Sequence, residues 1–344
     1  MIKVATTLFV ITYGLFSFCY SKVADSKTQV DQRVSISGKT CFRKPFSSYD
    51  DWLAMISKGA AKRFKNEHKQ QASIAKFKHR FPQQSFEKYR QSMICETMLY
   101  ASGKGKVSGF VIKPKHIDDK LPVVVYNRGG NGAYGRVNMA YMMSSLLPLA
   151  EHGFIVIGSQ YRGYSKNPDP DFDDEFGGAD VEYILSLTRL IPSIDGADAS
   201  RIGVLGASRG AMQSYIALRA GLKAKALVTI AGNTDLKAGL SFRPEMENVY
   251  KQRIPHYATQ GSEQLKERSA LYWIDELEAS MPILLLHGEE DKRVASFHSV
   301  NMADKLKALH RPHKLVLYRG DDHSLNQNRD AALQIVIDWF KQHL

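Results

Sequence analysis

The most informative part of this sequence is Ile202-Gly-Val-Leu-Gly-Ala-Ser-Arg-Gly210. It begins with a short apolar run, which predicts a buried strand. The pentapeptide Gly-Ala-Ser-Arg-Gly follows directly, and residues 211–219 then have a helical pattern. A Gly-x-Ser-x-Gly motif between a strand and a helix predicts a tight turn that presents the serine at the edge of a sheet. Ser208 is therefore a candidate nucleophile.

Short apolar runs alternate with helical patterns through the rest of the chain. They are Val123–Tyr126, Ile155–Ile157, Ile202–Leu205, Ala226–Ile230, Ile283–Leu286 and Leu315–Tyr318. The runs are continuous, which is typical of strands covered by helices on both faces. An alternating pattern at 94–112, broken by Ser102-Gly-Lys-Gly105, predicts a hairpin before them. The sequence thus predicts an α/β fold with a mostly parallel, doubly wound sheet and an N-terminal antiparallel hairpin.

We divide the chain into three segments: a signal peptide (1–21), an N-terminal helical arm (22–92) and an α/β catalytic domain (93–344). The connection between Ile230 and Ile283 is far longer than usual for such a fold. Its aromatic residues favour a helical cap over the active site at about 233–280, with a remote structural insertion as the alternative.

The N-terminus predicts export. Lys3 precedes an uncharged, mostly apolar run, and small or polar residues follow as far as Ser21, the expected cleavage site. The alternative is a membrane anchor, for which the run is shorter than the ~20 residues required. Export to the periplasm or the medium would leave Cys41 and Cys95 in an oxidising compartment. We expect them to form a disulfide; the alternative is two separate buried thiols.

The formal net charge of +12 is concentrated in residues 40–90. The same segment carries Trp52, Ile56 and Ala60 at helical spacing, so it is most simply a packed helix with a solvated basic face. No nucleic-acid motif accompanies the charge, and nucleic acid is not expected as a partner. A weak contact with an anionic surface through residues 40–90 is the alternative.

A serine nucleophile needs a base, and the base needs an acid to orient it. Asp291 lies just after one buried strand and His323 just after the next, so the three residues come in the order Ser, acid, His. We predict that they form a catalytic triad. Their competitors are Glu289, Glu290, Asp321, Asp322 and His287.

The oxyanion of an acyl-transfer intermediate needs hydrogen-bond donors. We expect the backbone N–H of Arg209 at the helix N-terminus, and that of Gly130 in the glycine-rich loop at 127–135. In the same loop Arg128, Asn131 and Tyr134 are candidate substrate contacts, with a structural salt bridge as the alternative for Arg128. The loop matches neither the P-loop nor the dinucleotide pattern.

An acidic loop, Asp169-Pro-Asp-Phe-Asp-Asp-Glu175, lacks the glycine that an EF-hand requires at the position of Asp174. We therefore interpret it as a solvated loop with helix-capping carboxylates. The predicted chemistry requires neither a metal nor an organic cofactor.

Residues 93–344 resemble the catalytic domain of the prolyl oligopeptidase family of α/β-hydrolases. The resemblance is carried by residues 121–130, Tyr161-Arg-Gly163, residues 206–210, 287–294 and 320–323. It implies Ser208, Asp291 and His323 as the triad and Gly130 and Arg209 as oxyanion donors. Arg128 departs from the His or Tyr of many members. About seventy residues lie between the predicted signal peptide and the first core strand, too few for the β-propeller of the familiar peptidases, which needs ~300.

These observations predict an exported serine hydrolase that cleaves a small peptide or ester through an acyl-enzyme. A serine peptidase is favoured over the main alternative, a small-molecule carboxylesterase, because the family resemblance points to peptidases. A non-catalytic binding protein on the same fold is the further alternative.

Overall fold

The computed structural model describes residues 38–103, 105–161 and 174–344. The predicted signal peptide, Arg162-Gly163 and most of the acidic loop at 169–175 lie outside the described residues. None of the helices within the described ranges combines the length and the apolar character needed to cross a membrane.

In this part of the chain nine strands form one sheet in the order β1-β2-β3-β5-β4-β6-β7-β8-β9. Their bounds are β1 Lys39–Thr40, β2 Met93–Ser102, β3 Gly105–Pro114, β4 Leu121–Asn127, β5 Ile155–Ser159, β6 Ala197–Ala207, β7 Ala226–Ile230, β8 Ile283–Gly288 and β9 His313–Tyr318. Strands β1, β2, β3 and β5 pair antiparallel, and the strands from β5 through β9 pair parallel. The predicted α/β fold and its entry hairpin are confirmed.

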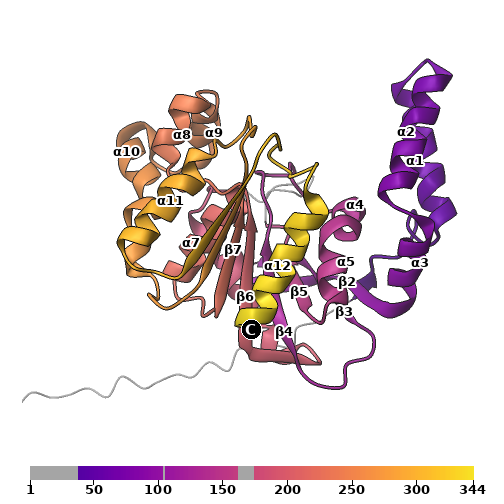
Figure 1. The fold of residues 1–344 in the computed structure, drawn as a ribbon, viewed down its shortest axis with the longest axis horizontal. Coiled ribbons are helices and arrows are strands. Elements are labelled where there is room, and N and C mark those ends of the chain that lie inside the picture. The colour runs from indigo at the N-terminus through magenta and orange to yellow at the C-terminus, as the bar shows by residue number, and fades with distance from the viewer. Residues whose placement is uncertain (1–37, 104, 162–173) are drawn as a thin grey trace, which may run out of the picture. The chain divides into compact units, whose positions relative to one another are not determined.

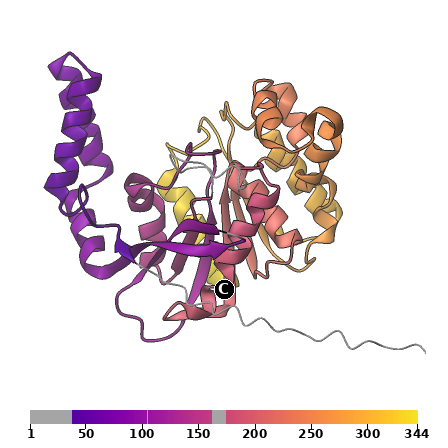
Figure 2. The ribbon, with the colours of Figure 1, turned by 180° about the vertical axis from the view of Figure 1, so that it is seen from behind.

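Helices cover both faces of the sheet, and alternate residues of each central strand explain why. In β4, Val124 packs into one core with Leu146 and Phe340, whereas Val123 packs into a second core with Ile184. Figure 1 shows α12 in front of the sheet, and Figure 2 shows the opposite face. Apart from three helices between β7 and β8, the α-helices after β3 are α4 Met139–Tyr141, α5 Leu147–Glu151, α6 Glu182–Thr188, α7 Arg209–Arg219, α11 Phe297–Ala308 and α12 Arg329–His343. The continuous apolar runs therefore belong to strands buried on both sides.

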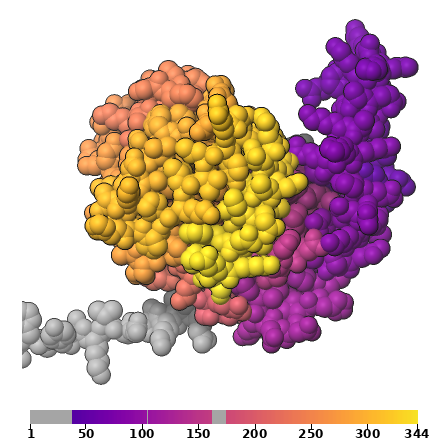
Figure 3. Space-filling view, viewed as in Figure 1, coloured from indigo at the N-terminus to yellow at the C-terminus, as the bar shows by residue number. Residues whose placement is uncertain are grey.

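The N-terminal arm consists of three helices, α1 Tyr49–Arg63, α2 Glu67–Arg80 and α3 Gln83–Ser92, and the space-filling view in Figure 3 shows them in indigo. The break between α2 and α3 falls at Pro82, because proline fixes φ and lacks an N–H. Trp52 joins the helices through ring contacts with Phe77 (4.8 Å between centroids) and Phe81 (5.1 Å). A disulfide links Cys41, before α1, to Cys95 in β2. The arm is thus attached to the sheet covalently, and its aromatic residues belong to the same core as Phe110 and Ile112 of β3.

The long connection between β7 and β8 is helical, with α8 Leu236–Phe242, α9 Met246–Arg253 and α10 Tyr257–Glu267. These helices share a small core with Phe176 and with Met212 of α7, in which Tyr250 and Phe176 pack edge to face at 5.2 Å. Met246 and Val249 of α9 line the cavity that contains Ser208. The insertion therefore contributes directly to the walls of that cavity.

Candidate active site

Ser208 occupies a sharp turn between β6 and α7. Its φ of +56° and ψ of −123° are unusual for a residue with a side chain. The turn requires the flanking glycines. A Cβ on Gly206 would lie 2.5 Å from the Ser214 hydroxyl, and one on Gly210 would lie 1.9 Å from the Asn127 carbonyl oxygen. The structure thus gives the physical reason for the Gly-x-Ser-x-Gly pattern, and Ser208 lines a cavity of about 870 Å³.

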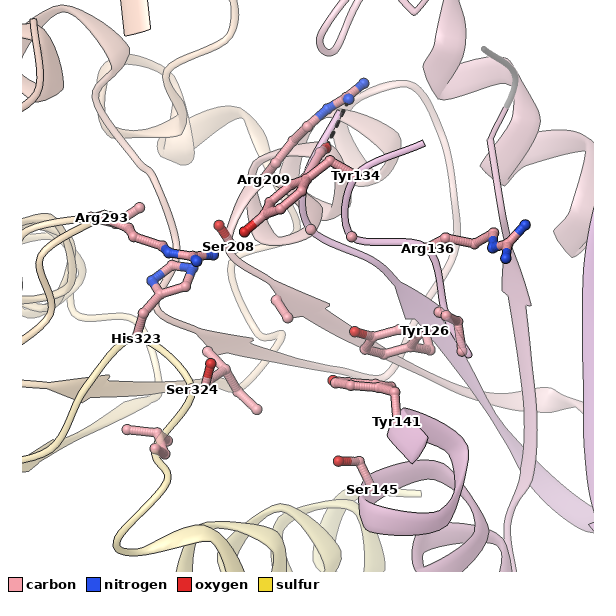
Figure 4. Close-up of a pocket in the computed structure, with 18 of the residues that line it drawn as sticks. Tyr126, Tyr134, Arg136, Tyr141, Ser145, Ser208, Arg209, Arg293, His323 and Ser324 are labelled. Atoms are coloured by element: carbon pink, nitrogen blue, oxygen red, sulfur yellow. Dashed lines mark hydrogen bonds between the residues drawn. The ribbon is translucent and has the colours of Figure 1, made fainter. Parts of the chain in front are cut away.

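Asp291 and His323 meet in the loops that follow β8 and β9. His323 Nδ1 donates to Asp291 Oδ2 at 2.6 Å, and the backbone N–H groups of Arg293 and Val294 donate to the other carboxylate oxygen. Burial opposes the ionised carboxyl, but the hydrogen bonds from His287 and His323 outweigh it and hold the pKa of Asp291 below its usual value. His323 also lines the cavity of Ser208 (Figure 4).

The competing residues take other positions. His287 is fully buried behind Asp291, with Nδ1 2.7 Å from the Ser299 hydroxyl and Nε2 3.2 Å from Asp291 Oδ2. Asp321 accepts hydrogen bonds from its own loop, including the backbone N–H of Asn328 at 2.9 Å. The remaining competitors are Asp322, which also binds its own loop, and the exposed Glu289 and Glu290. Among the described contacts, Asp291 is the carboxylate that meets His323.

The glycine-rich loop after β4 approaches Ser208 closely. A Cβ on Gly129 would lie 3.0 Å from Ser208 Cβ. Gly130 has a φ of +75°, and a Cβ there would lie 2.2 Å from the Tyr134 carbonyl oxygen. Asn131 and Tyr134 line the cavity, and the Tyr134 side chain is largely exposed. The loop expected to supply Gly130 as a donor therefore lies against the nucleophile.

The prediction that Arg128 contacts substrate is wrong. Arg128 is fully buried and does not line the cavity. Its guanidinium donates five hydrogen bonds to backbone carbonyls, to Gln160 from both Nε (2.9 Å) and Nη2 (2.7 Å), to Gly132 (2.8 Å), and to Gly129 and Tyr134 (both 3.0 Å). The alternative of a structural salt bridge fails as well, because these partners are carbonyls. Arg128 is the interior support around which the loop folds.

The interpretation of the acidic loop as solvated is also wrong at Asp174, which is fully buried, as is Asp180 just beyond the loop. The Arg209 side chain donates to Asp174 at 2.5 and 2.6 Å and also to Asp180. Arg209 further donates to the Gly130 carbonyl at 2.9 Å, and Asp174 accepts the Gly132 N–H at 2.7 Å. Burial opposes the ionised form, but the charge and hydrogen bonds of Arg209 lower the pKa of Asp174. This buried cluster, which lies outside the glycine-rich loop, holds that loop in place through Gly130 and Gly132.

Arginines line the cavity, a feature that the sequence pattern did not predict. Arg80 comes from the arm, Arg293 follows Asp291, and Arg329 begins α12. Their shared position depends on tertiary contacts, which leave no local signal in the sequence. The buried carboxylates do have such a signal: the uncharged, glycine-rich Phe176-Gly-Gly178 between Asp174 and Asp180. Within the described ranges, no three His, Cys, Asp or Glu side chains are grouped so that they could hold a metal ion.

The doubly wound sheet and the serine turn define this chain as an α/β-hydrolase. The family model described as "Prolyl oligopeptidase family" matches residues 140–344, more than half of the chain. The chain belongs to the prolyl oligopeptidase family and is a serine hydrolase. The resemblance inferred from the sequence motifs is therefore confirmed.

Individual relatives have different lengths. The uncharacterized peptidase YtmA of Bacillus subtilis is 28% identical over 267 residues, which cover 77% of this chain and 98% of that protein. Acylaminoacyl peptidase of Pyrococcus horikoshii is structurally similar, with a TM-score of 0.64 and 22% identity over 75% of this chain but only 43% of its own. A mutant of the esterase rPPE has a TM-score of 0.59 and 18% identity, and 84% of its chain is covered. The last two likenesses concern the fold alone.

Proposed function

We propose that this chain hydrolyses small peptides or esters through an acyl-enzyme on Ser208. The observation that carries the proposal is the 2.6 Å hydrogen bond between His323 and Asp291 beside the serine turn. His323 takes the proton of the Ser208 hydroxyl as it attacks the substrate carbonyl, and later donates it to the leaving group. Asp291 keeps the ring in the required tautomer and stabilises its charged form.

The tetrahedral oxyanion is held by the backbone N–H groups of Arg209 and Gly130. The N-terminus of α7 favours negative charge at the Arg209 N–H. The loop containing Gly130 is fixed on two sides, by Arg128 within it and by Arg209 against it, so its donor is positioned before the reaction. Loss of one such donor lowers kcat by about 100- to 1000-fold.

A fluorophosphonate probe tests the nucleophile. We expect it to label the wild-type protein and not Ser208→Ala, whose hydrolysis rate should fall by at least about 10⁴-fold. His323→Gln should label far more slowly than wild type, because the serine loses its base. Equal labelling of wild type and Ser208→Ala would reject the proposed nucleophile. Absence of labelling in a folded wild-type protein would favour the alternative, a non-catalytic binding protein.

The leaving group is tested with para-nitrophenyl esters and short peptidyl para-nitroanilides, each measured as kcat/KM with Ser208→Ala as the control. Both classes share the acylation chemistry, and they differ in the leaving-group pocket. A serine peptidase is expected to cleave both. Cleavage of the esters alone would establish the alternative, a carboxylesterase.

We also propose that the protein is exported and cleaved after Ser21. The support is the apolar run after Lys3 together with the Cys41–Cys95 disulfide, since such bonds persist in oxidising compartments. The test is cell fractionation followed by the intact mass of the mature protein. Recovery of full-length protein in the cytosol with both thiols free would contradict export.

A further inference from the structure

The cavity that contains Ser208 has a one-sided charge. Apart from His323, its charged lining residues are all arginines, and of the described residues that line it none is Asp, Glu or Lys. The arginines are Arg80, Arg136, Arg209, Arg243, Arg293 and Arg329. A concave site lined by one sign of charge concentrates ligands of the opposite sign. Only the arginines without a counter-charge are available to such a ligand.

Three of the arginines are already engaged or directed elsewhere. The Arg209 guanidinium is bound by the buried Asp174 and Asp180. Arg243 forms an ion pair with Glu245 at 2.9 Å. Figure 4 shows the guanidinium of Arg136 directed away from Ser208. These three arginines are therefore poor candidates for binding an anionic group of the substrate.

Arg80 and Arg329 are different, because neither forms an ion pair with a carboxylate anywhere in the described ranges. Arg80 ends α2 and Arg329 begins α12, a position where the helix dipole disfavours a cation. Among the hydrogen bonds of the described residues, the Arg329 guanidinium donates to the amide oxygen of Asn326 alone. Burial and the like charge of Arg329 lower the pKa of Arg80. Two cations thus share one wall of the cavity without a counter-charge.

Both residues line the cavity, and the charge of Arg329 acts on Arg80, so the two lie on the same side of it. The charge of Arg329 acts on Tyr141, which Figure 4 places beside Tyr126 and Ser145 and apart from Ser208 and His323. At the other end, the Arg293 guanidinium lies 5.7 Å from the centre of the Tyr134 ring. Apolar residues, among them Leu205, Ile230, Leu333 and Val336, contribute to the lining. The cavity therefore offers a reactive end, apolar walls and a cationic end.

We propose that the cavity selects substrates that carry a carboxylate several bonds from the scissile carbonyl, and that Arg80 and Arg329 bind this carboxylate. The inference rests on the proposed function, because it assumes that bonds are cleaved at Ser208. Guanidinium groups suit the task, since they pair with carboxylates through two parallel hydrogen bonds. The carboxylate belongs either to the acyl group of an ester or to an acidic side chain of a peptide.

Two matched substrate pairs test the proposal on the full chain. The ester pair is para-nitrophenyl hydrogen adipate and para-nitrophenyl hexanoate, which differ only in a terminal carboxylate or methyl group. The peptide pair is acetyl-Glu-Ala and acetyl-Gln-Ala para-nitroanilide. We expect wild type to show a higher kcat/KM for the anionic member, by roughly tenfold, and this preference should weaken as salt is added. A preference in either pair supports the proposal and identifies the source of the carboxylate.

Variants of the two arginines test whether they cause the preference for the anionic substrate. In the double variant Arg80→Met and Arg329→Met, the ratio of kcat/KM for the anionic substrate to kcat/KM for the neutral one should fall by roughly tenfold. The corresponding double Lys variant should keep most of the wild-type ratio. Arg243→Met is the matched control, because that arginine lines the same cavity but is already paired with Glu245.

Two outcomes would overturn the proposal: no anionic preference in either pair, or a ratio that is unchanged in the double Met variant. Failure of the proposed function is distinguishable, because it would appear as loss of fluorophosphonate labelling at Ser208 and of hydrolysis of all four substrates.

Discussion

Arg128 and Arg209 hold the glycine-rich loop beside Ser208, whereas Arg80 and Arg329 line the cavity on the side of Tyr141, and the surroundings of the two pairs differ. The guanidinium groups of the first pair are buried and are bound by carbonyls or carboxylates. The residues of the second pair line the cavity, and no carboxylate of the described residues forms an ion pair with them. The same residue type therefore serves two purposes a short distance apart.

The comparison shows that satisfaction of hydrogen bonds, rather than charge alone, separates a structural arginine from one that is available to a ligand. A buried guanidinium without partners is costly, and each of the two interior arginines is accordingly held by several acceptors in the folded state. An arginine that faces solvent can keep its charge without a partner and offer it to a substrate. Substitutions in the buried cluster, in the arm and at a buried histidine test this distinction, with the largest effect expected in the cluster.

The strongest test removes one carboxylate from the buried cluster. Asp174→Asn leaves Arg209 with a weaker partner in a dry site, and we expect the free energy of unfolding to fall by about 3–5 kcal/mol. The labelling rate of Ser208 should fall as well, because Asp174 also holds the Gly132 N–H. Chemical denaturation and fluorophosphonate kinetics measure the two effects.

Asp195→Asn is the matched control. Asp195 pairs with Lys113 at 2.9 Å, but its side chain is 97% exposed, so solvent screens the pair. We expect both the free energy of unfolding and the labelling rate to stay close to wild type. Equal effects of Asp174→Asn and Asp195→Asn would mean that burial does not distinguish the two carboxylates.

The second test concerns the arm that carries Arg80. The disulfide closes a loop with a sequence separation of 54 residues, and the chain-entropy model assigns it about 4 kcal/mol. We expect the double variant Cys41→Ser and Cys95→Ser to have a lower Tm. Its kcat/KM should fall more for anionic substrates than for neutral ones, because Arg80 is held by the arm. A lower Tm with an unchanged anionic-to-neutral ratio would show that the disulfide does not position Arg80.

The sequence predicted what depends on local patterns and on strand order. Ser208, Asp291 and His323 each follow an apolar run, and parallel strands bring their carboxyl ends to one edge of the sheet. The burial of Arg128 could not be predicted in this way, because the sequence of a glycine-rich loop does not indicate whether its arginine is buried or exposed to solvent. Arg80 and Arg329 are separated by more than 200 residues and meet only through the packing of the arm.

His298 provides the third test, because it is a basic group that is buried without being charged. Burial, reinforced by the nearby His287, lowers its pKa to about 4, and its Nδ1 has no hydrogen-bond partner in the described ranges. The unfolded chain binds a proton near pH 6.5 that the folded chain binds only near pH 4, so this contribution to stability is present above pH 6.5 and is lost as the pH falls towards 4. The free energy of unfolding should fall by about 3 kcal/mol across this window, and the fall should be smaller in His298→Gln.

His68→Gln is the control, because His68 is at an exposed position on α2. Its free energy of unfolding should change with pH as in wild type. If the free energy of unfolding changed with pH equally in wild type and His298→Gln, His298 would be charged in the folded protein below pH 6.5. It would then carry a charge as the cavity arginines do, in spite of its burial.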